Sequence, residues 1–449
     1  MESKKAYPLW RRKVAPLLVV LARLVAGATF AFSGFVKTVD PAGMSLKIRE
    51  YLSAFGIDFM MPITFFLAVC LGVYEMILGV NLLFGSYRRV SSVMLFLTML
   101  VMTPLTLYLA LADPISDCGC FGEALYLTHW QSFAKNVVLL LISLFLVWGN
   151  RKVKSIYHKE IQSLTLYFVL FFAVGLSLHA YYNQPIFDFR PYKVGTDISR
   201  AISSEAFDQT RYLYRNGDRE ELFTVDELPT DTAWHFVARI EEEMPAQQDI
   251  TNFVIYDGED DITDAILSDP GYTFLIMSPS LAFAESGVID KLDELYDYTR
   301  EYHYNLYCLT ASTPEEIAEW QDNTGADYPI YSMDASTIQT IVRGNPGIVL
   351  LHDGVIVQKV RPSRLPEEAE LNAPIDELPF GQLTPYSPMR PLLTVLIIFF
   401  VPMLLLLLTS KTVEAYVVQA RVRRLARLRK MRENLMEKTH KNIEKNPNK

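Results

Sequence analysis

Long apolar stretches fill the first 182 residues of the chain and return once near its end, whereas the segment between them alternates short apolar and polar runs. A bilayer core of about 30 Å needs roughly 20 mostly apolar residues in a helix. Six stretches meet this requirement, which predicts a six-span α-helical membrane bundle. They are residues 16–37, 62–84, 90–112, 131–148, 164–182 and 392–410.

The first apolar stretch follows a basic head that contains Lys4, Lys5, Arg11, Arg12 and Lys13. It is longer than the apolar core of a secretory signal peptide, and it ends without a small-residue cleavage site. We therefore expect it to remain in the membrane as an anchor.

Lysine and arginine in the flanking segments predict the orientation, because short basic loops stay on the cytoplasmic side. Basic residues gather in the N-terminus, at Arg88 and Arg89, in residues 151–159 and in the tail, whereas the loop 113–130 has no lysine or arginine. We therefore expect a protein of the cytoplasmic membrane with both termini in the cytoplasm. The loop 113–130 and the large segment 182–390 then face outward.

Charge divides the chain into two unlike parts. Residues 185–390 hold 14 Lys+Arg and 38 Asp+Glu, a balance of −24, which leaves +15 for the rest of a chain whose net charge is −9. The acidic segment is therefore expected to form a separate external domain. The segment after residue 410 holds 12 basic and 4 acidic residues, with apolar side chains at every third or fourth position in RVRRLARLRKMR.

This basic tail is typical of an amphipathic helix that lies on anionic lipid at the cytoplasmic surface. Binding of nucleic acid by the basic tail is the alternative interpretation. We expect a lipid surface as the partner and no nucleic acid, because basic helices beside a membrane span are common anchors.

Two charged residues stand out within the apolar stretches, and charges in the hydrocarbon region usually face the bundle interior and pair. Arg23 and Glu75 are predicted to lie at similar depths from the cytoplasmic side, which makes them candidates for an ion pair with each other. Such a pair either fixes the packing of two helices or belongs to a proton path or a quinone site. The sequence leaves both interpretations open.

The outer end of the first span reads SGFVKTVDP. Ser33 and Gly34 permit close helix contact. Lys37 is expected to extend its ammonium group to the membrane interface, and Asp40-Pro41 ends the helix. The segment EYLSAFGI that follows from Glu50 has an interfacial pattern.

Two of the four cysteines lie close together, in the run DCGCFGE between the third and fourth spans. Cys118 and Cys120 can close a small, strained and labile disulfide ring. Asp117 and Glu123 would raise the pKa of these thiols, whereas the lysine at the end of the first span or a following helix N-terminus would lower it. A structural zinc site needs four ligands, and His129 alone lies near, so we expect no metal. A turn with inert cysteines is the alternative.

These residues make the first four spans resemble the DoxX/MauE group of four-helix membrane proteins, whose MauE branch is named for methylamine utilisation. The likeness rests on SGFVKTVDP at 33–41, LKIREYL at 46–52, Glu75 and DCGCFGE at 117–123, and it covers about the first third of the chain. It implies a protein of the cytoplasmic membrane linked to redox or disulfide chemistry outside the membrane. It also implies that the two loop cysteines are the working pair.

The external segment begins with a polar connector, QPIFDFRPYKVGTDI, and short strand-like runs around a hairpin turn at Gly217-Asp218, which predict a β-rich lead-in. From residue 252 strands alternate with helices, which predicts a sheet with crossover connections. The predicted strands of this part are 253–258, 272–278, 305–312 and 329–333, followed by a hairpin around Asp353-Gly354. The predicted helices are 289–302, 314–323 and 335–343.

This order resembles α/β thioredoxin-like domains. Asn345-Pro346-Gly347 stands where that family has a cis-proline before a strand, so Pro346 marks a candidate groove for an extended peptide. The chain departs from the family where Ser278-Pro279-Ser280-Leu281 replaces the Cys-x-x-Cys of redox-active members. Cys308 and Cys70 lie in apolar runs and are expected to be buried thiols. We therefore expect no oxidoreductase activity from the external domain itself.

The predicted organisation has eight parts. They are a basic N-terminus (1–15), a four-helix membrane domain (16–150), a cytoplasmic loop (151–163), a fifth span (164–182), the β-rich lead-in (183–250), the thioredoxin-like domain (251–390), a sixth span (391–410) and the basic tail (411–449).

The leading hypothesis is a thiol–disulfide oxidoreductase in which Cys118 and Cys120 pass electrons from external thiols to a membrane quinone. The sequence leaves open which of the two cysteines is the attacking thiolate and which is its resolving partner. The alternative is a non-catalytic assembly subunit whose external domain holds an external protein partner. A transporter is a third hypothesis, which rests only on Arg23 and Glu75. The sequence names neither substrate nor partner.

Overall fold

The computed structural model describes residues 9–115, 118–149, 154–203, 210–216, 219–223, 234–241, 253–383 and 389–445. The chain forms two compact units, the first of Met1–Tyr181 with Pro388–Lys449 and the second of Tyr182–Ser387. Within the described part, six helices of the first unit are long and apolar enough to cross a membrane. The predicted number of spans is confirmed.

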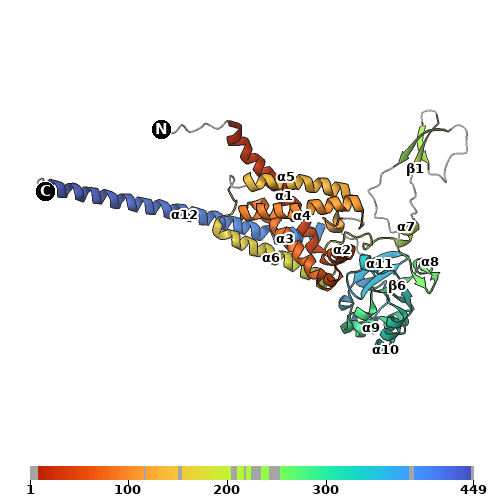
Figure 1. Ribbon diagram of the computed structural model, residues 1–449. Coiled ribbons are helices and arrows are strands. Elements are labelled where there is room, and N and C mark those ends of the chain that lie inside the picture. Colours follow the sequence, from red (N-terminus) through yellow and green to blue (C-terminus); the bar gives the residue numbers. More distant parts are fainter. Residues whose placement is uncertain are drawn as a thin grey trace. The chain divides into compact units, whose positions relative to one another are not determined.

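The helices of the first unit follow the predicted stretches (Figure 1). The short helix α2 and the 3₁₀ turn η1 fill the segment between the first two spans, where the sequence predicted an interfacial segment. The elements are α1 (Leu9–Val39), α2 (Pro41–Ala54), η1 (Asp58–Ile63), α3 (Thr64–Phe84), α4 (Arg88–Ala112), η2 (Gly122–Ala124), α5 (His129–Gly149), α6 (Lys159–Tyr182) and α12 (Met389–Lys445).

The described part of the basic tail is helical, as its pattern predicts, and it continues the sixth span instead of forming a helix of its own. α12 runs without a break over 57 residues, from the sixth span into the tail (Figure 1). The described side chains after Ser410 are almost all exposed. No glycine or proline follows Ser410 before Pro447, so the usual signals that end a helix are missing there.

Glycines let α1 and α3 pack with their backbones in close contact. A Cβ atom added at Gly34 would lie 2.2 Å from the backbone nitrogen of Met76, and one added at Gly79 would lie 2.1 Å from that of Ala31. Small residues at a helix interface permit this approach in membranes. The predicted role of Gly34 in close helix contact is confirmed.

The second unit contains a seven-stranded mixed sheet in the order β10-β9-β6-β7-β8-β4-β5. β6, β7 and β8 are parallel neighbours, and the hairpin of β9 and β10 pairs antiparallel with β6. The elements are β4 (Tyr256–Asp257), β5 (Asp260–Asp261), α8 (Thr263–Leu267), β6 (Tyr272–Ser278), α9 (Ile289–Glu301), β7 (Asn305–Thr310), α10 (Pro314–Thr324), β8 (Ile330–Ser332), α11 (Ala335–Ile341), β9 (Gly347–His352) and β10 (Val355–Val360).

Most strands and helices of this sheet match the sequence prediction, with one exception. The predicted strand at 253–258 is reduced to the two residues of β4. Its first part is held locally instead, because the Ile255 N–H donates to Thr263 Oγ1 and the Ile255 carbonyl accepts from Ile262.

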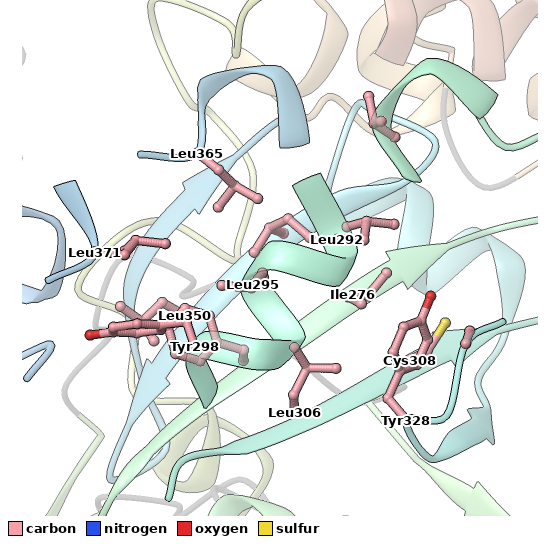
Figure 2. Packing of buried hydrophobic residues seen from close by; sticks show 14 of the residues in the cluster. Ile276, Leu292, Leu295, Tyr298, Leu306, Cys308, Tyr328, Leu350, Leu365 and Leu371 are labelled. Atoms are coloured by element: carbon pink, nitrogen blue, oxygen red, sulfur yellow. The ribbon is translucent and has the colours of Figure 1, made fainter. Parts of the chain in front are cut away.

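An apolar core joins α9 to the sheet. Figure 2 shows Leu292 and Leu295 of α9 lying against residues of the strands. Cys308 is fully buried in this core, and burial raises the pKa of its thiol to about 12. The expectation that Cys308 is a buried thiol is confirmed. Cys70, by contrast, is exposed on α3, so the expectation that it is buried is wrong: Cys70 lies on the outer face of the helix, whereas Ala68 and Gly72 are buried.

The connector before the sheet is packed onto it by a buried ionic cluster. Arg190 Nε lies 2.6 Å from Asp188 Oδ1, and Lys359 Nζ lies 2.6 Å from Asp188 Oδ2. Arg190 also donates to the carbonyl of Ile341, at 2.9 Å. Burial alone would raise the pKa of Asp188, but Lys359 and Arg190 hold it well below its usual range. The segment read as a polar connector is therefore part of the folded domain.

The β-rich lead-in forms a three-stranded antiparallel sheet in the order β2-β1-β3. Its strands are β1 (Thr210–Asn216), β2 (Arg219–Phe223) and β3 (His235–Glu241). The strand-like runs that the sequence predicts at 212–214 and 235–240 lie within β1 and β3. Residues 222–223 of the third predicted run, 222–225, lie in β2, and the rest of that run lies outside the described residues. The predicted turn at Gly217-Asp218 lies outside the described residues.

The contact between α1 and α3 predicts the effect of a single methyl group. We expect Gly79→Ala to lower the free energy of unfolding by about 1–3 kcal/mol, because the new Cβ overlaps the α1 backbone. Gly175→Ala on α6 is the matched control, since a Cβ there meets no atom within 4 Å. Thermal unfolding of both purified variants in one detergent checks this. Equal midpoints for the two variants would contradict the close contact.

Candidate functional site

The two cysteines lie in a loop that two glycines shape. Gly119 and Gly122 have φ angles of +61° and +54°, in the left-handed region that favours glycine. Between the third and fourth spans these turns bring Cys118 Sγ to 2.6 Å from Cys120 Sγ. The two sulfurs are therefore adjacent, and a small movement suffices to join them at the length of about 2.05 Å of a disulfide bond.

A buried ion pair between α1 and α3 holds this loop. Lys37 Nζ lies 2.8 Å from Glu75 Oε2, and the two residues are only 3% and 8% exposed. Lys37 also donates to Ser33 Oγ at 2.7 Å and to the carbonyl oxygen of Cys120 at 2.6 Å. An ammonium group has three donors. All three have acceptors, and one acceptor belongs to the cysteine loop.

Two predictions about these charges are wrong. Lys37 does not extend to the membrane interface, because its ammonium group is buried against Glu75. Arg23 does not pair with Glu75 but donates to the carbonyl oxygens of Leu82 and Leu83, at 3.0 and 3.3 Å. The register of the two antiparallel helices is the reason. It places Arg23 beside the C-terminal end of α3, where the last carbonyls lack partners within the helix and attract a cation.

The other predicted site residues are placed differently. Asp40 is the N-cap of α2, where its carboxylate accepts from Gly43 N at 2.9 Å, so it ends the first span as predicted. Glu123 is half-buried in η2. Asp117 lies outside the described residues. His129 Nε2 lies 3.0 Å from Asp113 Oδ1.

A cavity of about 310 Å³ lies beside the cysteines within the first unit. Its wall is mainly apolar and comes from α1 to α5. Pockets of about 300–1,000 Å³ with few polar groups are typical of small-molecule sites. The apolar lining includes Phe30, Met44, Leu52, Met99, Leu105 and Leu139, and the polar lining includes Ser33, Lys37, Glu75, Cys118, Cys120, Lys135 and Asn136.

Sequence reasoning missed three residues of this cavity. Lys135 Nζ lies 4.5 Å from the centre of the Phe121 ring, and Asn136 Nδ2 donates to Thr106 Oγ1 at 3.2 Å. Tyr51 of α2 donates its hydroxyl to the Cys118 carbonyl at 2.9 Å. Lys135 lies inside the predicted fourth span. The cost of a charge in that region, which singled out Arg23 and Glu75, would have singled it out too.

The surroundings of the two thiols shift their pKa values in opposite directions. The hydrogen bond with Cys118, with the charges of Lys135 and Lys37, lowers the pKa of the Cys120 thiol to about 6 against the opposing effect of burial. The same hydrogen bond and burial raise the pKa of the Cys118 thiol. Cys120 is also the more exposed of the two. The pair therefore offers a thiolate next to a thiol that keeps its proton.

The peptide-groove candidate lies in the second unit. Pro346 is buried, and its peptide bond with Asn345 is cis. The Asn345 carbonyl accepts from Glu285 N at 2.9 Å, and the Asn345 side chain lies 2.6 Å from Ser278 Oγ. The backbone carbonyl next to Pro346 is therefore already hydrogen-bonded within the chain.

Comparison with known protein families agrees with the MauE resemblance of the first four spans. Residues 15–149 match the family described as Methylamine utilisation protein MauE. The matched region holds both cysteines and every residue that lines the cavity, although it is less than a third of the chain. No curated protein matches the chain. With its six apolar helices the chain is a multi-pass membrane protein, and its first part is similar to that family.

The buried ion pair predicts a double-variant result. Lys37→Met leaves Glu75 buried without its cation, so we expect it to lower the free energy of unfolding by about 3–5 kcal/mol. Adding Glu75→Gln should restore much of this loss, because no unpaired charge remains. Lys47→Met is the control, since its partner Glu50 is exposed and such pairs contribute about 1 kcal/mol or less. Thermal unfolding in detergent that gives equal losses for Lys37→Met and Lys47→Met would refute a structural role for the pair.

The lowered pKa of Cys120 predicts a pH profile for alkylation. Thiolate forms as the pH rises through the pKa, so the rate at Cys120 of the reduced protein should reach half its maximum near pH 6. Lys135→Met should move this midpoint upward, because it removes a cation that favours the thiolate. Arg89→Gln, outside the cavity lining, should not. Mass spectrometry after brief iodoacetamide treatment measures the rate, and a midpoint near that of free cysteine, about 8.5, would contradict the assignment.

Proposed function

We propose that the first unit is a thiol–disulfide oxidoreductase in which the Cys118/Cys120 pair passes electrons to a quinone bound in the adjacent cavity. The observation that carries the proposal is that one cavity is lined by both cysteines, by Lys37 and Lys135, and by mainly apolar side chains. A redox-active pair and a site for an apolar electron acceptor thus share a wall.

The chemistry of the lining suits a quinone. A quinone ring is apolar on its faces and carries two oxygens that gain negative charge when it is reduced. Apolar walls accept the ring and the start of its tail, and the ammonium group of Lys135 supplies a donor for one oxygen. Preorganised donors aimed at developing negative charge accelerate such reactions. The volume of about 310 Å³ is enough for a ring and a short part of a tail.

The electron and proton balance closes with the pair, a quinone and water. Oxidation of the Cys120 thiolate and the Cys118 thiol forms one Sγ–Sγ bond and releases two electrons and one proton. A quinone that takes up both electrons would become a quinol with this proton and one further proton from water. Cys120 is the attacking thiolate, supported by its lowered pKa, and Cys118 is the resolving thiol. An external dithiol reduces the Cys118–Cys120 disulfide again through a mixed disulfide and is itself oxidised.

Lys37 and Glu75 act as positioning residues in this proposal. Lys37 holds the carbonyl of Cys120, and Glu75 holds Lys37. This contact fixes the loop backbone next to the attacking sulfur. The basic flanking segments support an orientation with both termini in the cytoplasm and with the cysteine loop and second unit on the outer side of the cytoplasmic membrane.

We also propose that the second unit is a thioredoxin-like domain without a thiol site. The strand order β10-β9-β6-β7-β8 and the cis bond before Pro346 support this fold. Ser278 ends β6, and Ser278-Pro279-Ser280-Leu281 stands where two cysteines would be needed. Redox chemistry would therefore fall to the first unit, and the second would bind or orient an external partner.

The missing cysteines of the second unit favour one other candidate function, a non-catalytic assembly subunit. Here the second unit holds an external protein, and Cys118 and Cys120 only shape the loop. Purification from native membranes separates the two functions. A stoichiometric complex that persists in Cys118→Ser supports assembly, whereas loss of thiol-dependent turnover in that variant supports redox catalysis.

Quinone reduction by the purified full chain tests the leading proposal. Under anaerobic conditions, we expect the reduced protein to convert a short-chain quinone to quinol, followed by absorbance, with loss of the Cys118 and Cys120 thiols. Cys118→Ser and Cys120→Ser should each abolish the reaction, because neither can close the disulfide. Cys70→Ser is the matched control and should react like the parent chain, since Cys70 is outside the cavity lining. If both loop thiols stay free in excess quinone, the proposal fails.

A further inference from the structure

A second cavity, of about 930 Å³, lies at the end of the first unit where α3 ends and α4 begins. Its walls come from the turn before α4, the segment before α6 and the part of α12 just after the sixth span. None of its lining residues belongs to the cysteine cavity. It is therefore a separate site, at the basic end of the bundle.

Cations dominate this cavity. Arg89, Lys154 and Lys159 are exposed. Glu414 is the one carboxylate among the described lining residues, and it lies 3.3 Å from Lys411. The cavity therefore keeps a strong positive charge. Its basic lining consists of Arg88, Arg89, Lys154, His158, Lys159 and Lys411.

Two helix starts add to this charge, and an unpartnered ring nitrogen offers a further position for a hydrogen bond. α4 begins at Arg88 and α6 at Lys159, and the positive end of a helix dipole favours anions. No side chain caps the start of α4. His158 Nδ1 is buried and has no hydrogen-bond partner among the described residues. The two helix starts and the basic side chains therefore favour an anionic group with several oxygens.

An apolar groove continues from the basic cavity. This groove, of about 250 Å³, is lined by side chains of α3, α4 and α6, and it shares Tyr87 and Val90 with the basic cavity. Its other lining includes Tyr74, Ile77, Leu78, Met94 and Leu166. A phosphate pocket joined to an apolar groove has the shape of one phospholipid, with a charged headgroup above an acyl chain. Basic pockets between membrane helices are known to bind anionic headgroups.

We propose that this cavity binds the phosphate headgroup of an anionic phospholipid and that the groove receives part of an acyl chain. Inorganic phosphate shares the headgroup chemistry, but it leaves the groove without an occupant. The inference does not depend on the proposed redox function.

Lipid binding to the full chain tests the proposal. Native mass spectrometry of the detergent-purified protein measures its affinity for a short-chain phosphatidylglycerol, with phosphatidylcholine as the zwitterionic comparison. We expect Arg89→Gln/Lys159→Gln to weaken phosphatidylglycerol binding about thirtyfold, from two lost cations near the headgroup. Arg423→Gln/Arg427→Gln in the exposed tail is the matched control, with the same loss of charge, and should leave the affinity nearly unchanged.

The groove gives a second variant that separates the two anion sources. Val90→Trp fills the shared wall at a position that is 61% exposed, so the fold should tolerate it. It should weaken phosphatidylglycerol binding but not the binding of inorganic phosphate. Equal weakening of phosphatidylglycerol by both double variants would overturn the proposal, because the affinity would then follow net charge alone. Phosphatidylglycerol binding that is fully displaced by inorganic phosphate and insensitive to Val90→Trp would overturn the lipid part.

Discussion

The Lys37–Glu75 ion pair is the constraint on which the described site depends. A charge in the apolar interior of the bundle is costly unless it is paired and its donors are satisfied. Glu75 and Ser33 satisfy only two of the three donors of Lys37, and the third goes to the carbonyl of Cys120. The position of the cysteine loop is therefore coupled to the energy of a buried charge. Any movement of the loop away from α1 would leave an ammonium donor unpaired.

That coupling works only because α1 and α3 are very close. A methyl group at Gly34 or Gly79 would overlap the backbone of the facing helix, and separating the helices would lengthen the contact between Lys37 and Glu75. On the other side of the loop, Tyr51 of α2 binds the carbonyl of Cys118. The backbone is thus held at both cysteines from two different helices. Their thiols lie next to each other and line the cavity, so the two sulfurs are held in a fixed geometry.

Properties that depend on composition and length could be predicted from the sequence, and properties that depend on register could not. The six spans follow from apolar length, and the importance of Gly34 follows from its size. The partner of Glu75 depends on how α1 slides along α3, and the sequence pattern suggested Arg23 where the packed helices select Lys37. In the second unit, the contacts of Asp188 with Lys359 join residues far apart in sequence, so local patterns could not reveal that the connector is folded.

Lys135, which the sequence analysis missed, shows that the role of a cation depends on its burial. Cations lie beside the apolar cavity at the cysteine end of the bundle and beside the apolar groove at its basic end. The exposure of these cations differs. Near the cysteines the cations are buried or half-buried, where low dielectric makes their effect on a neighbouring thiol strong. At the basic end Arg89, Lys154 and Lys159 are exposed, so salt screens them and they favour an anion that arrives from outside the protein. Burial therefore separates a cation placed to shift the pKa of a neighbouring thiol from one placed to attract an anion from solution.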